Sequence, residues 1–124
     1  MKKNNKKGFT LAELLIVVAI IGVLVAVSIP IFTSQLAKSR LATNQANARA
    51  AYAAATAAYL NDDTVKGGTY TTSDGKFVAG TPTGTDVTNT DIASWTTTDM
   101  GTTTYKTWGV VLDNNGSVTK YTHE

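Results

Sequence analysis

The chain begins with a short polar segment, continues in one long apolar run, and then changes to small and polar residues. Residues 14–32 are apolar throughout except for Gly22, Ser28 and Pro30. At about 1.5 Å per residue, a helix over this run matches the roughly 30 Å of hydrocarbon in a bilayer. The run therefore predicts a membrane-spanning helix.

The helical pattern continues beyond this run. No proline or glycine occurs from residue 31 to residue 66, and alanine, the best helix former, dominates the approach to Leu60. One helix face recurs at spacings of three and four: Leu41, Gln45, Ala48, Tyr52, Ala55 and Tyr59. We expect one helix from about Phe9 to Leu60, kinked near Pro30, whose Tyr52 and Tyr59 face meets the C-terminal sheet. The opposite, alanine-rich face would let neighbouring helices approach closely.

After the helix, the pattern changes to short strands joined by turns. Asn61, Asp62 and Asp63 are typical of a helix end, and the glycines at 67–68 are typical of a turn. Threonine then supplies 15 of the 39 residues in 69–107, a composition that suits exposed strands. The C-terminal half is therefore predicted to be a small β-sheet.

Two hairpins and one helical turn are predicted within this half. One hairpin surrounds Asp74-Gly75, the other surrounds residues 113–116, and residues 91–95 form the helical turn. Alternate residues of the strand before the second turn would face the helix: Trp108, Val110 and Leu112. The fold class expected is α+β, a long helical spine packed on a small antiparallel sheet of three or four strands, with a lollipop shape.

Basic charge is concentrated at the N-terminus. The formal net charge is +2, but four of the 11 basic residues are lysines within residues 1–7, and the remainder carries seven basic against nine acidic residues. Such a body lacks the basic face that a nucleic-acid-binding protein needs. The lysines instead predict that the N-terminus stays in the cytoplasm while the C-terminal part is sent outward. The absence of cysteine excludes disulfides and thiolate chemistry.

Glu13 is an acidic residue at the edge of the apolar run. A carboxylate at full depth in a bilayer costs roughly 2.5–3.5 kcal/mol, and somewhat less near the interface. A plain signal anchor gains nothing from that cost. A secretory signal peptide, whose one plausible cleavage site here is Ala26-Val27-Ser28, does not carry such a charge. Something must therefore compensate Glu13.

Residues 8–13, Gly-Phe-Thr-Leu-Ala-Glu, and the apolar run that follows resemble the processing motif of type IV prepilins. The resemblance covers residues 7–32 and departs from the family at Ala12, where isoleucine or valine is commoner. It implies that a membrane-embedded prepilin peptidase cuts between Gly8 and Phe9. It also implies that Phe9 then becomes an N-methylated terminus.

The resemblance implies an assembly role for three residues of the helix, since Glu13 stands where the family has its glutamate and Gly22 and Pro30 where it has helix breakers. The new α-amine of Phe9 in a neighbouring subunit could pair with Glu13 in a medium of low dielectric constant. Gly22 and Pro30 both weaken a helix, so the stretch between them could lose helicity at modest cost. The resemblance implies that it melts in the filament, and a simple bend is the alternative.

The expected organisation has four parts. Residues 1–8 are a cleaved cytoplasmic leader, 9–32 the transmembrane and assembly half of the helix, 33–60 its amphipathic alanine-rich half, and 61–124 a threonine-rich β-domain.

The function that the resemblance implies is structural. The chain would start as a single-pass protein of the cytoplasmic membrane and then polymerise with itself, as a major pilin, into a surface filament for adhesion, motility or DNA uptake. A pseudopilin of a type II secretion or competence system is the alternative, and a minor tip pilin acting as adhesin or DNA receptor is less favoured. The implied partners are the prepilin peptidase, the pilus assembly machinery and membrane lipid. No cofactor, metal or direct nucleic-acid site is expected.

Catalytic chemistry has little support in the sequence. The single histidine, His123, is the penultimate residue, where fraying is expected. Residues 113–116 bear some likeness to a calcium loop but lack its terminal glutamate and its number of ligands, so a hairpin turn is the better interpretation. Asn115-Gly116-Ser117 also fits a glycosylation sequon. No enzyme activity is expected.

Overall fold

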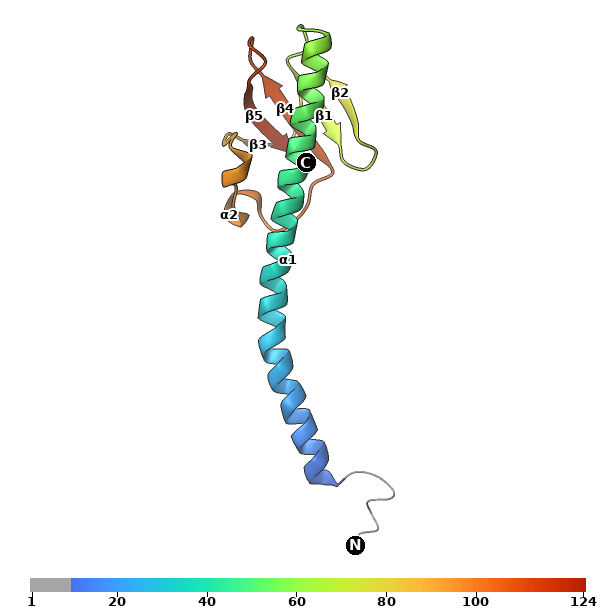
Figure 1. The fold of residues 1–124 in the computed structure, drawn as a ribbon, viewed down its shortest axis with the longest axis vertical. Coiled ribbons are helices and arrows are strands. Elements are labelled where there is room, and N and C mark those ends of the chain that lie inside the picture. The colour runs from blue at the N-terminus through green and yellow to red at the C-terminus, as the bar shows by residue number, and fades with distance from the viewer. Residues whose placement is uncertain (1–9) are drawn as a thin grey trace. The chain divides into compact units, whose positions relative to one another are not determined.

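The computed structural model describes residues 10–124, which form an α+β fold (Figure 1). The elements in chain order are α1 Leu11–Asn61, β1 Gly67–Thr71, β2 Lys76–Ala79, β3 Thr85–Val87, the 3₁₀ turn η2 Ile92–Ser94, α2 Thr97–Met100, β4 Thr107–Leu112 and β5 Val118–His123. The fold class expected from the sequence is confirmed, because one long helix is followed by a small antiparallel sheet. A division into two compact units falls inside α1, between Leu36 and Ala37.

The bounds of α1 lie close to those expected. The helix begins at Leu11, one residue after the non-helical Thr10, whereas Phe9 lies outside the described residues. It ends at Asn61, after which Asp62 Oδ1 accepts hydrogen bonds from the backbone N and the hydroxyl of Thr64. These bonds hold the chain in a turn that cannot continue the helix. Pro30 lies within the helix, and the kink expected there stays a prediction.

The sheet has five antiparallel strands in the order β2-β1-β4-β5-β3. Both expected hairpins are confirmed, as β1–β2 and β4–β5, and the expected helical turn is η2. The expected number of strands is wrong, because β3 forms a short outer strand with Val87 opposite Tyr121. The glycine pair at 67–68 opens β1 rather than a turn. A side chain on Gly67 would collide with the carbonyl of Val110, so this close pairing of strands requires glycine.

The second half of α1 lies over the sheet in the C-terminal unit (Figure 1), and it meets the sheet mainly through small residues. The buried residues of the helix are Asn44, Ala48, Ala51 and Ala55. They face a strand whose alternate residues are buried as predicted: Trp108, Val110 and Leu112. The expectation that Tyr52 packs on the sheet is wrong, because the residue is 43% exposed and is not part of the core cluster. Tyr59 is partly buried against the core. The small alanine side chains let the helix backbone come close to the sheet, and the large Trp108 side chain fills the space between them.

The connection from β3 to β4 completes the core. Trp95 and Met100 are almost fully buried, and the Trp95 ring stacks on Trp108 with 5.7 Å between ring centroids. Thr96 and Asp99 form a capping box that starts α2. Threonine, which is abundant here, therefore acts as a cap as well as a strand residue.

Candidate assembly segment

The first turn of α1 is held by a side-chain cap. Thr10 Oγ1 accepts a hydrogen bond from the backbone N of Glu13, and Thr10 O accepts one from the backbone N of Leu14, both at 3.2 Å. An N-cap of this kind satisfies an amide that has no partner within the helix. Sequence reasoning missed Thr10, although the spacing Thr-Leu-Ala-Glu is that of a capping box and could have revealed it.

Glu13 is exposed in this first turn, where the helix dipole favours a negative charge. Within residues 10–124 the one ion pair joins Lys120 and Asp86, so the Glu13 carboxylate has no ionic partner there. The predicted cleavage residues, Gly8 and Phe9, lie outside the described residues. Glu13 is thus a carboxylate at the start of an apolar helix, without a charge partner among residues 10–124.

The helix after Glu13 is apolar on every side. Each large apolar side chain in residues 11–32 is at least 46% exposed, from Val25 at 46% to Leu11 at 73%. The most apolar window of α1 has a mean hydropathy of 3.1, and none of it is buried. By length and composition this helix can cross a membrane. A helix that is apolar all round needs lipid or other protein to cover it.

Gly22 and Pro30 lie further along the same helix. Gly22 is more than two helical turns from Glu13, and Pro30 is more than two turns from Gly22. A side chain on Gly22 would meet nothing within 4 Å, so the position is open to a neighbour. Pro30 has no backbone N–H to donate within the helix. Hydroxyls bond to the backbone on both sides of it, from Ser28 Oγ to Leu24 O at 2.7 Å and from Thr33 Oγ1 to Ile29 O at 3.0 Å. The structure therefore arranges the three predicted assembly residues along one helix rather than gathering them into a pocket.

His123 is part of the folded core, and the expectation that it frays is wrong. It is 9% exposed at the end of β5, where it pairs with Trp108 of β4 and Thr85 of β3. Its ring stacks on Tyr105 with 3.7 Å between centroids. Burial lowers the pKa of His123 below its ordinary value. These aromatic surroundings suit a core histidine and do not present it as a general base.

The turn at residues 113–116 is a hairpin turn, as predicted. Asp113 Oδ1 accepts hydrogen bonds from the backbone N of Asn115 at 2.8 Å and of Ser117 at 2.9 Å. Aspartate commonly closes a turn in this way. One carboxylate oxygen of Asp113 is therefore engaged within the turn itself.

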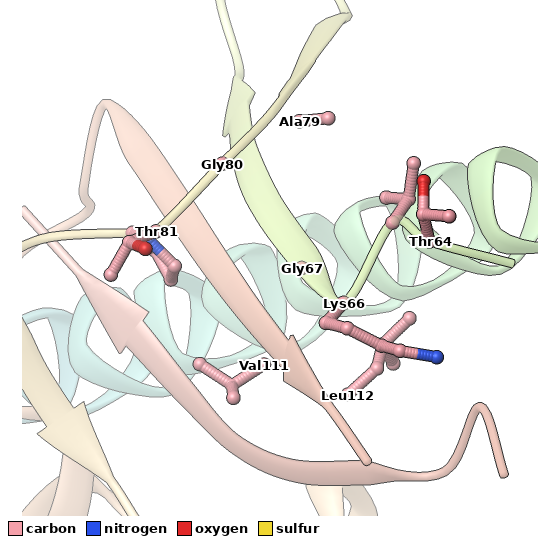
Figure 2. Close-up of a pocket in the computed structure, with 10 residues that line it drawn as sticks. Thr64, Lys66, Gly67, Ala79, Gly80, Thr81, Val111 and Leu112 are labelled. Atoms are coloured by element: carbon pink, nitrogen blue, oxygen red, sulfur yellow. The ribbon is translucent and has the colours of Figure 1, made fainter. Parts of the chain in front are cut away.

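A hollow of about 540 Å³ lies beside the sheet, where the start of β1 and the ends of β2 and β4 come together (Figure 2). Its single charged side chain is Lys66, whose Nζ donates to Asp63 O at 2.6 Å. The same ammonium lies 5.0 Å from the ring centroid of Tyr59. Because this cation is already engaged, the hollow offers backbone, methyl groups and hydroxyls but no cluster of reactive groups.

Comparison with known proteins identifies the N-terminal segment. Residues 3–29 match the family model of the prokaryotic N-terminal methylation motif. In this segment, the chain is similar to proteins that carry this motif. The match includes Gly8, Phe9, Glu13 and Gly22 and stops one residue before Pro30.

Several curated fimbrial proteins are similar to this chain. Fimbrial protein EcpC of Eikenella corrodens is 36% identical over 84 residues, which cover 63% of this chain and 54% of that protein. Type IV major fimbrial protein FimA of Dichelobacter nodosus is 54% identical over 39 residues, which cover 32% of this chain and 25% of FimA. The chain thus spans about half the length of one relative and a quarter of the other. No solved structure matches the chain.

Proposed function

We propose that the chain is a structural subunit of a type IV pilus, which polymerises through the N-terminal half of α1. The observation that carries this proposal is the surface of that segment, which is apolar on all sides and begins with Glu13. Residues 11–29 of this segment lie within the match to the methylation motif. Polymerisation would cover this apolar surface with neighbouring helices. It would also give the Glu13 carboxylate a charge partner.

Processing precedes assembly in this proposal. The precursor spans the cytoplasmic membrane once with its N-terminus inside, and lipid covers the apolar residues. A prepilin peptidase then cuts between Gly8 and Phe9, removes residues 1–8, and leaves Phe9 as the N-methylated terminus. Methylation keeps the positive charge of the new amine.

Assembly then replaces lipid with other copies of the same helix. The ammonium of Phe9 in one subunit pairs with Glu13 of its neighbour, where the low dielectric constant strengthens the attraction and penalises any unpaired charge. Gly22 offers an open position for close approach, and the stretch from Gly22 to Pro30 can unwind to fit the filament. The pilus assembly machinery in the membrane would carry out the transfer.

The C-terminal β-domain, residues 61–124, would form the outside of the filament. The names of the relatives, a fimbrial protein and a type IV major fimbrial protein, support a major pilus subunit over a pseudopilin. The filament would serve surface attachment, motility or DNA uptake. These roles are mechanical and need no catalytic centre in the subunit.

Protein sheared from the cell surface tests the proposal. Electron microscopy should show thin fibres, and mass spectrometry of those fibres should find this chain as their most abundant protein, starting at methylated Phe9. A deletion strain is the control and should lose the fibres. A chain that starts after Ser28, or a surface without fibres containing it, would refute the proposal.

A further inference from the structure

Two loops of the C-terminal unit are tied to the same side of α1. Gln45 Nε2 donates to Ile92 O at 2.9 Å, and the Tyr59 hydroxyl donates to Asn114 O at 3.1 Å. The first contact holds the loop that contains η2, and the second holds the turn between β4 and β5. Both loops are therefore fixed at a set distance along the helix.

A groove lies between these loops, with a volume of about 620 Å³. Arg49 and Tyr52 come from the helix between the two tethers, and neither side chain has a hydrogen-bond or ion-pair partner within residues 10–124. Tyr52 is 43% exposed. The polar and aromatic residues that line the groove are Arg49, Tyr52, Thr90, Asp91, Ser117 and Tyr121.

Further hydrogen bonds make the walls of the groove rigid. In one wall, Trp95 Nε1 donates to Asn89 O at 2.7 Å, and Asn89 Nδ2 donates to Ser94 Oγ at 2.9 Å. In the other wall, Asp113 holds the turn before Ser117 through the backbone N of Ser117. A site that exists before its ligand arrives loses less entropy on binding.

Tyr121 is the most buried polar residue of the groove. Its residue is 2% exposed, and its hydroxyl has no hydrogen-bond partner among the described residues. Burial raises the pKa of Tyr121 to about 12. The nearby Tyr52 also raises this pKa, and Arg49 lowers it. The three side chains therefore share one neighbourhood, and the Tyr121 hydroxyl stays protonated as a donor. Because this hydroxyl is not enclosed, it reaches solvent in the groove and can donate to a ligand there.

We propose that this groove binds an uncharged saccharide. The Tyr52 ring offers an apolar face for the C–H side of a pyranose, and its edge is free to donate a hydrogen bond. Arg49 supplies donors and Asp91 supplies acceptors, which together match vicinal hydroxyls that both donate and accept. The groove volume lies within the range of small-molecule sites. This site goes beyond the role of the subunit in a filament and does not depend on polymerisation.

The charge balance of the lining argues against a ligand that carries a charge of one sign. Arg49 and Asp91 carry opposite charges, so an anion would meet Asp91 and a cation would meet Arg49. A purely apolar ligand would leave the Tyr121 hydroxyl and both charged groups without partners. A neutral ligand rich in hydroxyl groups satisfies the whole set.

Saturation-transfer NMR on the full chain tests the site. The protein is held in a phosphocholine detergent, because sugar-based detergents would compete. The probes are D-glucose, D-galactose, N-acetyl-D-glucosamine and lactose, each up to about 10 mM, with N-acetylneuraminic acid as the anionic comparison. At least one neutral probe should receive saturation on its ring protons and show a saturable titration.

Three variants locate the binding. Tyr52→Ala should weaken it about tenfold or more through loss of the ring face, and Asp91→Asn should weaken it through loss of charged acceptors. Val78→Ala is the matched surface control, since Val78 is 69% exposed on β2 outside the groove, and should leave binding unchanged. Near-ultraviolet circular dichroism checks that each variant is folded. The proposal is overturned if no neutral probe binds, if binding survives both groove variants, or if the anionic probe binds more tightly than the neutral ones.

Discussion

Thr10 Oγ1 accepts a hydrogen bond from the backbone N of Glu13, and this contact sets the first turn of α1. The contact orders the backbone at the residue whose carboxylate is proposed to meet a neighbouring amine. A charge pair in low dielectric is worth most when its members are held in place beforehand. Thr10 would therefore position Glu13 for assembly in addition to capping the helix.

Replacing Thr10 with alanine should loosen the first turn of the helix. Loss of an N-cap typically costs about 1 kcal/mol, which corresponds to an increase of about fivefold in the opening of the capped amide. Hydrogen exchange at the Glu13 amide, measured on the full chain in detergent micelles, should rise accordingly. Thr10→Ser keeps the hydroxyl and should exchange at the original rate. Equal exchange in the alanine variant would contradict the capping role.

Replacing Glu13 with glutamine should separate processing from assembly. The amide has nearly the same shape but no charge, so the precursor should insert and be processed, while the pairing with the Phe9 amine is lost. Immunoblots of membranes should show mature protein, and electron microscopy should show few or no fibres. Glu124→Gln, an exposed carboxylate at the other end of the chain, is the control and should assemble normally. Normal fibres from the Glu13 variant would contradict the charge-pair mechanism.

The long helix and both hairpins follow from local signals in the sequence. The apolar run, the alanine-rich stretch and the residues Asn61 to Asp63 define α1, while Asp74-Gly75 and residues 113–116 define the turns. Each of these signals acts over a few neighbouring residues, so no knowledge of distant contacts is required. The three predicted assembly residues are likewise local, because they all lie on one helix.

What the sequence did not reveal depends on contacts between distant segments. The spacing of Tyr52 matches that of the buried helix residues, but Tyr52 lies at the edge of the contact between α1 and the sheet. The buried alanines bring the backbone of α1 close to that of the sheet and leave no room for a tyrosine between them. The three residues of β3 form a strand only because β5 is beside them. His123 is ordered by Tyr105 and Trp108, which precede it by many residues. Local propensity cannot show such pairings.

The close contact between α1 and the sheet predicts a difference between two alanines. Ala51 is fully buried, so Ala51→Leu should overpack the interface and lower the free energy of unfolding by about 1–3 kcal/mol. Ala53 is exposed on the same helix, so Ala53→Leu should change it by no more than about 0.5 kcal/mol. Thermal unfolding of the full chain, followed by near-ultraviolet circular dichroism, compares the two. Equal stability of the variants would mean that the helix does not pack on the sheet through Ala51.

Stability should fall in mild acid because of His123. Burial lowers its pKa in the folded state from the ordinary 6.5, so the unfolded chain binds a proton at higher pH than the folded chain does. The unfolded state is then favoured as pH falls from about 6.5 toward the lower folded pKa, and stability decreases through that window. Asp62, whose pKa is lowered from 3.8, acts only in stronger acid.

A substitution isolates this effect, since His123 is the only histidine in the chain. His123→Phe keeps an aromatic ring to stack on Tyr105 but cannot take up a proton. Melting temperatures of the full chain should decrease between about pH 7.5 and pH 5.5 for the original sequence and stay nearly level for the variant. The same decrease in both proteins would show that the acid sensitivity arises elsewhere, and a level profile in both would show that His123 is accessible to protons in the folded state.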